Sequence, residues 1–129
     1  MILTKEIIVS KVRKRGKPFE DVPMPELGDE VEIRIMSPSL GGMDDLQRIL
    51  LKNGRPQEGY KANLLIATCV DSEGQPLFDE DDFQMLNDEF DSQAFMKLVP
   101  VAERLCGFSQ QNINKIVKNL NRDQSNGSD

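Results

Sequence analysis

The clearest hydrophobic pattern in the chain is a strict alternation between residues 30 and 36. Val31, Ile33 and Ile35 would lie on one face of an extended strand, and the charged residues between them would lie on the other. Side chains alternate across a strand in this way, and a single covered face is typical of an antiparallel sheet. We therefore predict a strand with one solvent-facing side at residues 30–36.

Two other segments of the N-terminal half have the composition of extended structure. Residues 7–13 are rich in β-branched side chains and end at a turn signal, which predicts another strand. Residues 19–28 contain Pro23 and Pro25, which restrict the backbone and predict an extended connection or an edge strand. A short helix is expected from about residue 44 to residue 52, because apolar positions recur there at helical spacing.

The apolar run at residues 64–70 is ambiguous, because its periodicity does not separate a buried strand from a buried helix. The run ends at residues 71–75, where Gly74 favours a tight turn, and residues 76–78 then return to apolar character. We favour a strand that enters a hairpin, and a buried helix is the alternative.

The C-terminal half changes to helical periodicity. Asp79 is a suitable N-cap with acidic residues in the following turn, and Asp91 or Ser92 begins the next helix. Pro100 lies off the apolar stripe of that second helix, which predicts a kink or a break near Val99.

A closing helix is expected from residue 110 to about residue 120, after a Gly107 C-terminal cap. Its apolar positions recur at helical spacing and are our candidate partner-binding residues: Ile113, Ile116, Val117 and Leu120. The alternative is that this stripe only completes the core. The polar residues 121–129 are predicted to form a flexible tail.

Together these elements predict an α+β fold, with a small N-terminal antiparallel β-sheet or hairpin and a C-terminal half of three to four α-helices. Residues 1–120 are expected to form one domain, which suits a chain of 129 residues.

The composition removes several classes of function. The chain has no His, which excludes His-dependent catalysis and His metal ligands. It has no nucleophile motif, phosphate-binding loop or calcium-loop spacing, so we expect no catalytic residue, no metal, no cofactor and no enzymatic activity.

Cys69 and Cys106 are expected to be reduced and buried, and a disulfide or a reactive thiol is the alternative. No apolar run spans a membrane and the N-terminus is not a secretion signal, so no membrane partner is expected and the cytoplasm is the expected location.

The net charge of −6 is distributed unevenly along the chain. Residues 1–17 hold six cations and one acid, whereas residues 71–91 hold nine acids and no cation. The negative balance argues against general nucleic-acid binding. Two interpretations of the separated charges stay open: both stretches simply face solvent, or they form a bipolar surface that orients partners or other copies of the chain, so self-association is retained as a partner interaction.

Three blocks of the chain carry a resemblance to a known family. They are Val22–Ser37 (VPMPELGDEVEIRIMS) with the short helix after it, Leu64–Asp82 (LLIATCVDSEGQPLFDEDD), and Leu105–Ser109 with a closing helix that contains Lys118 and Asn119. Their order and spacing resemble the tail assembly chaperones of long-tailed, lambda-like bacteriophages (siphoviruses) over about residues 5–120. Pro100 departs from this pattern, because the corresponding helix of the family is usually unbroken.

The resemblance implies a protein without enzymatic activity that acts during tail assembly. Proteins of this family bind the long, helical, aggregation-prone tape measure protein and keep it soluble until tail tube subunits polymerise around it. The expected partners are therefore the tape measure protein and the major tail tube protein. The expected location is the host bacterial cytoplasm, with the protein absent from the mature virion. The alternative is a structural tail or neck component that is retained in the virion.

Overall fold

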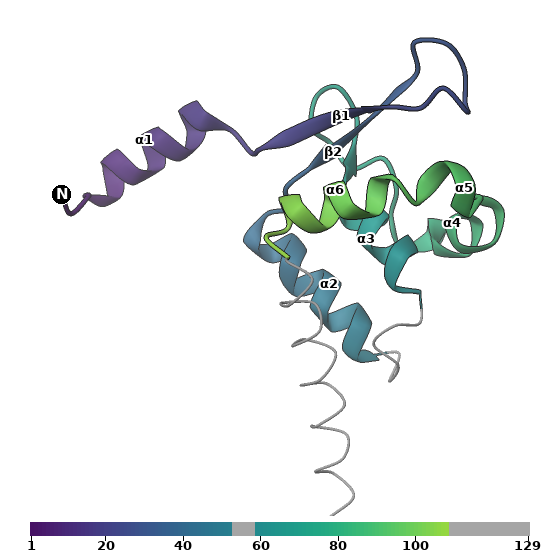
Figure 1. Ribbon diagram of the computed structural model, residues 1–129. Coiled ribbons are helices and arrows are strands. Elements are labelled where there is room, and N and C mark those ends of the chain that lie inside the picture. The colour runs from purple at the N-terminus through teal and green to yellow at the C-terminus, as the bar shows by residue number, and fades with distance from the viewer. Residues whose placement is uncertain (53–58, 109–129) are drawn as a thin grey trace, which may run out of the picture.

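The computed structural model describes residues 1–52 and 59–108 and contains a three-stranded antiparallel sheet (Figure 1). The strands are β1 (Phe19–Pro23), β2 (Glu32–Met36) and β3 (Cys69–Val70), in the order β1-β2-β3. The strand predicted at residues 30–36 is confirmed for residues 32–36, whereas Glu30 lies in a turn with a φ of +64°. The edge strand predicted after Pro18 is confirmed as β1, and so is the α+β class.

One face of this sheet is covered by helices. Ile35 is fully buried, and it lies opposite Cys69 of β3 in the register of the sheet. The helices α3 (Tyr60–Thr68) and α6 (Leu98–Leu105) pack against β2 on this side. The alternation read in the sequence thus places its apolar side chains toward the core.

The helix α3 lies at the centre of the domain. It contacts β2, α2 (Leu40–Lys52), α4 (Phe83–Glu89) and α6. Most of its side chains are buried, including polar ones: Ala62, Asn63, Leu64, Leu65 and Thr68.

The strand favoured for residues 64–70 is therefore wrong, and the alternative of a buried helix holds as far as Thr68. The run is apolar on nearly every side because α3 is surrounded by other elements, not because it lies inside a sheet. Only Cys69 and Val70 are extended. The predicted turn at residues 71–75 is confirmed, because the amide of Asp71 donates to the carbonyl of Gln75 at 2.8 Å and Gly74 has a φ of +82°.

The strand predicted at residues 7–13 is also wrong, because this segment belongs to α1 (Lys5–Arg15). The hydroxyl of Thr4 caps α1 by accepting from the amide of Ile7, at 3.4 Å. Glu6 in its first turn and three basic residues in its last turn match the helix dipole. β-branched residues favour strands only where a neighbouring strand packs beside them, and the described sheet offers this segment none.

Two helix boundaries differ from prediction. The helix α2 begins at Leu40, several residues before the predicted start, where the Ser39 hydroxyl accepts from the amide of Gly42 at 3.0 Å. The predicted break near Val99 falls between α5 (Ser92–Phe95) and α6. Pro100 stands in the first turn of α6, where a missing backbone N–H costs no helical hydrogen bond.

Capping residues predicted for the C-terminal half are confirmed. Asp79 caps the 3₁₀ helix η1 (Glu80–Asp82), which leads into α4, and Asp91 caps α5. Gly107 ends α6 with a φ of +79°. The closing helix predicted at residues 110–120 and the tail at residues 121–129 lie outside the described residues. Among the described helices, none is both long and apolar enough to cross a membrane.

Candidate functional site

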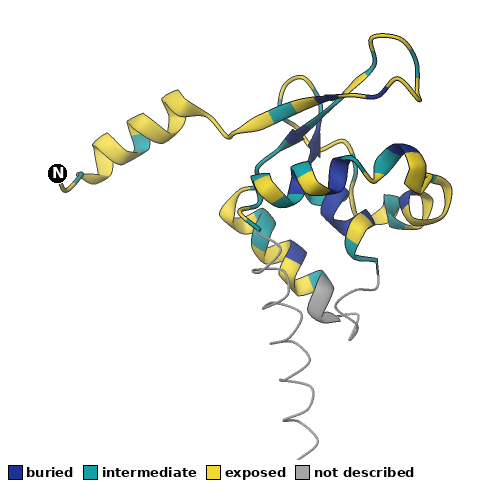
Figure 2. Ribbon diagram, in the orientation of Figure 1, coloured by how far each residue is buried: buried dark blue, intermediate teal, exposed yellow. Residues whose placement is uncertain are grey.

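The helix α1 is the first candidate interaction surface, because it projects from the domain and buries no residue (Figures 1 and 2). Large apolar side chains are exposed along it: Ile7 at 42%, Ile8 at 44% and Val12 at 60%. A helix of eleven residues is marginal in water without packing, so contact with a partner would stabilise it.

One side of α1 combines apolar and cationic residues at helical spacing. Ile8, Lys11, Val12 and Arg15 follow the i, i+3, i+4 and i+7 positions of one face, and all four are exposed. We call these four residues the arm face. An apolar centre flanked by cations suits an acidic protein surface with an apolar centre of its own.

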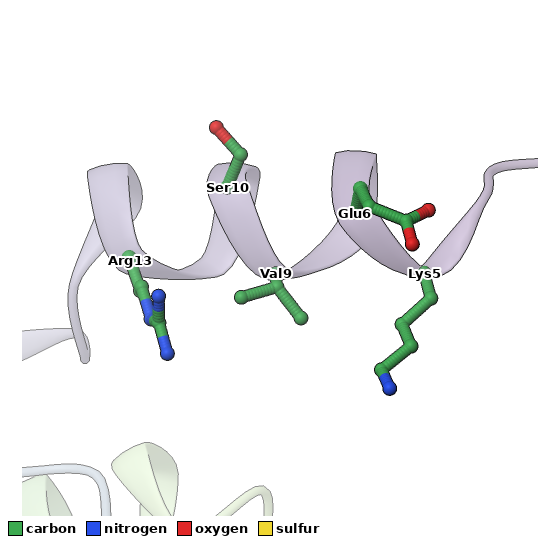
Figure 3. Close-up of a pocket in the computed structure, with 5 residues that line it drawn as sticks. All are labelled: Lys5, Glu6, Val9, Ser10 and Arg13. Atoms are coloured by element: carbon green, nitrogen blue, oxygen red, sulfur yellow. The ribbon is translucent and has the colours of Figure 1, made fainter.

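A shallow hollow lies along another side of α1, lined by Lys5, Glu6, Val9, Ser10 and Arg13 (Figure 3). Lys5, Val9 and Arg13 point to the same side of the helix, and Ser10 points away from them. Every described residue that lines this hollow belongs to α1 itself. The hollow is therefore part of an exposed helix surface and not an enclosed ligand site.

Four of the nine acids at residues 71–91 accept hydrogen bonds from backbone amides, at a turn or at a helix start. Asp71 accepts hydrogen bonds from the amides of Glu73 and Gln75, at 2.8 and 3.0 Å. Asp79 accepts from the amide of Asp81, and the Asp82 carboxylate accepts from the amide of Asp79, both at 2.9 Å. Across residues 1–52 and 59–108, no three His, Cys, Asp or Glu side chains gather as a metal site requires.

Three acids that do not cap a helix surround an exposed methionine of α4. Met85 is 38% exposed, and Asp81, Asp88 and Glu89 lie one helical turn away from it in either direction. All three carboxylates are exposed. We call these four residues the α4 face. Its layout, an apolar centre flanked by acids, is the electrostatic complement of the arm face.

The open face of the sheet carries a network that sequence reasoning missed. The guanidinium of Arg34 donates to both carboxylate oxygens of Asp21, at 2.7 and 3.0 Å, and to the carbonyl of Ser72, at 3.2 Å. It also lies over the ring of Phe19, 4.1 Å from the ring centroid. The hydrogen bonds from Arg34 hold the pKa of Asp21 below its usual value. The network links β1 and β2 to the turn after β3. We therefore assign it a structural role, because every contact named here joins parts of the sheet and its turn.

Burial raises the pKa of both cysteine thiols. Cys69 is buried, and burial raises its pKa to about 12. Cys106 is half-buried, and burial raises its pKa to about 11. Both are free, and both remain protonated at neutral pH, where a protonated thiol is a poor nucleophile.

The predicted partner-binding residues Ile113, Ile116, Val117 and Leu120 lie outside the described residues. The strand predicted at residues 7–13 does not indicate the arm face, which exists only because this segment is helical. A signal for it was present in the sequence, because Thr4 and Glu6 begin a helix, a basic turn follows, and Gly16 ends it.

The fold has a counterpart among solved structures. No protein-family model matches the chain, and no curated protein matches it at a significant level. The fold is similar to that of the bacteriophage HK97 tail assembly chaperone, with a TM-score of 0.56 and 17% sequence identity. The similarity covers 81% of this chain and 96% of the HK97 chain. The chain therefore has a tail assembly chaperone fold.

Proposed function

We propose that this protein is a non-enzymatic phage tail assembly chaperone that binds the tape measure protein. In this role it keeps the tape measure protein soluble and helps to recruit tail tube subunits in the host cytoplasm, and it is absent from the mature virion. The observation that carries the proposal is the fold similarity to the HK97 tail assembly chaperone over most of both chains.

The surface properties of the chain support this role. A chaperone must offer apolar surface to its client and still remain soluble. The exposed apolar side chains of the described residues and the net charge of −6 meet these two needs. The order of sequence blocks that resembles tail assembly chaperones is a second, independent support.

The proposed client-binding residues are Ile113, Ile116, Val117 and Leu120. Their spacing in the sequence is that of a narrow apolar stripe on a helix, and such a stripe would pack against the apolar side of a helical client. Residues on such a stripe bind by burying apolar area, so a charge placed there opposes binding.

Co-expression with the tape measure protein of the same genome tests the function. We expect the wild-type chain to keep the tape measure protein in the soluble fraction. A tape measure protein that pellets equally with and without the chain would contradict the proposal. Mass spectrometry of purified virions tests the alternative of a structural tail or neck component, which requires the chain to be present in the particle.

A pair of matched variants tests the client-binding stripe. Ile116→Asp with Leu120→Asp places two charges on the stripe and should leave the tape measure protein in the pellet. Asn114→Asp with Asn119→Asp adds the same two charges away from the stripe and should behave like wild type. If the first variant still solubilises the client, or if it unfolds, the stripe is not the binding surface.

A further inference from the structure

The junction between α1 and the sheet is short, and a hydrogen bond holds the chain on each side of it. On the helix side, the amide of Gly16 donates to the carbonyl of Val12 at 3.0 Å. On the sheet side, the carbonyl of Pro18 accepts from the amide of Ser37 at 2.8 Å. The backbone between Gly16 and Pro18 is therefore the whole connection between two parts that are each held in place.

The sheet side of the junction is further anchored by the first residue of β1. Phe19 lies opposite Met36 in the register of the sheet, and the guanidinium of Arg34 lies over its ring, 4.1 Å from the centroid. A cation over an aromatic face is attracted by the negative face of the ring. From Pro18 onward the chain is thus part of the body.

The remaining rotation is concentrated in Gly16. The ring of Pro18 fixes its own φ and restricts the preceding residue, Lys17, to extended backbone. Gly16 has a φ of +70° and a ψ of 178°, a conformation that essentially only glycine adopts. A Cβ on Gly16 would meet no atom of residues 1–52 or 59–108 within 4 Å, so the space around this residue is open.

The helix α1 lacks contacts that would fix its angle to the body. It buries no residue, and Figure 1 shows it pointing away from the sheet and the other helices. Among residues 1–52 and 59–108, no hydrogen bond or ion pair joins α1 to another helix or to a strand. Its own ends are capped, by the hydroxyl of Thr4 and by the amide of Gly16, so the contacts it does make hold it as a helix.

We propose that α1 pivots about Gly16 as a helical unit, while the sheet holds the chain from Pro18 onward. Its eleven residues span about 16 Å, so rotation at Gly16 carries Lys5 along an arc of about that radius. The arm face is thereby presented in a range of directions. A molecule that binds this face fixes the angle of α1, and the binding free energy must offset the lost rotational freedom. The motion occurs within one molecule, so it does not depend on the proposed chaperone function.

NMR spectroscopy of the full-length ¹⁵N-labelled chain in dilute solution tests the pivot. We expect α1 to keep helical chemical shifts and to have amide order parameters below about 0.6, against about 0.85 in β2 and α3. Its residual dipolar couplings should be smaller than those of the body, because averaging over many angles reduces them at any rate up to milliseconds. Couplings of α1 that fit the alignment of the body at full size would overturn the proposal. Coil-like chemical shifts in α1 would also overturn it, since a disordered segment does not pivot as a helix.

Two substitutions of Lys17 locate the rotation. Lys17→Pro fixes φ at residue 17 and restricts ψ of Gly16 to the extended range that it already occupies. The dipolar couplings of α1 should therefore rise toward those of the body. Lys17→Ala removes the same charged side chain without adding a ring, and the couplings should stay at their wild-type values.

Thermal unfolding provides the control for both variants. Lys17 is exposed, so neither substitution should change the unfolding midpoint of the body. The proposal fails if Lys17→Pro leaves the couplings of α1 as small as in the wild type, or if Lys17→Ala raises them equally.

Discussion

At the scale of single residues, Gly59 occupies a position where any side chain would be strained. Its φ is +71°, and a Cβ there would lie 2.7 Å from Cζ of Phe83. We expect Gly59→Ala to lower the free energy of unfolding by about 2 kcal/mol, because it adds both backbone strain and a clash with the ring. Urea unfolding measures this change.

The variant Gly107→Ala is the control that separates backbone strain from the clash with the Phe83 ring. It also has a positive φ, of +79°, but a Cβ there would meet no atom of residues 1–52 or 59–108 within 4 Å. Gly107→Ala should therefore cost only about 1 kcal/mol, from the backbone alone. Equal losses for the two variants would show that the Phe83 ring moves aside without cost.

Ionisation of the Cys69 thiol makes the free energy of unfolding depend on pH in the alkaline range. Burial raises the pKa of this thiol to about 12 in the folded protein, whereas in the unfolded chain it ionises near its usual value of 9.0. Its contribution is therefore complete below about pH 9 and is lost as the pH rises toward the folded pKa, because the unfolded state then binds fewer protons. Above about pH 9 we expect the free energy of unfolding to fall by about 1 kcal/mol per pH unit for this thiol.

Urea unfolding between about pH 8 and about pH 10 measures this slope. Cys69→Ala removes the thiol and should reduce the slope, although it also lowers stability at every pH by leaving a small gap in the core. An unchanged slope in the variant would contradict the role of Cys69.

At the scale of elements, β1 shows how an edge strand avoids pairing with other chains. The strand has only five residues, and Glu20 and Asp21 place charges on it. Pro23 also lacks the backbone donor that a neighbouring strand would require. Short length, charge and proline are the features that protect natural sheet edges from aggregation.

The helices α1 and α3 have opposite relations to the fold. Val9→Pro should break α1 and reduce the helical circular dichroism signal, yet leave the unfolding midpoint of the domain unchanged, because α1 buries no residue. A lower domain midpoint for Val9→Pro would show that α1 packs on the body.

Leu64→Ala in α3 should lower the free energy of unfolding by about 3 kcal/mol, because Leu64 is fully buried in the core.

At the scale of the whole molecule, charge is divided between the projecting helix α1 and the folded body. Residues 1–17 have a net charge of +5, whereas residues 18–108 have a net charge of −12. The exposed cations of α1 therefore lie on a separate part of the molecule from most of its acids.

The sequence by itself determined the features that depend on neighbouring residues. The alternation at residues 30–36 predicted β2, because successive side chains of a strand point to opposite faces. Asp79, Asp91, Gly74 and Gly107 predicted caps and turns, because each acts on backbone groups within a few residues.

Only the tertiary structure decided the features that depend on distant residues. The run at residues 64–70 became mainly a helix because β2, α2, α4 and α6 surround it, and an element covered on all sides is apolar in either conformation. Residues 7–13 became a helix because no strand of the described sheet lies beside them, while their local capping favours a helix. The opposite charges of the arm face and the α4 face were likewise not predictable as a pair of surfaces, because each surface exists only once its helix has formed.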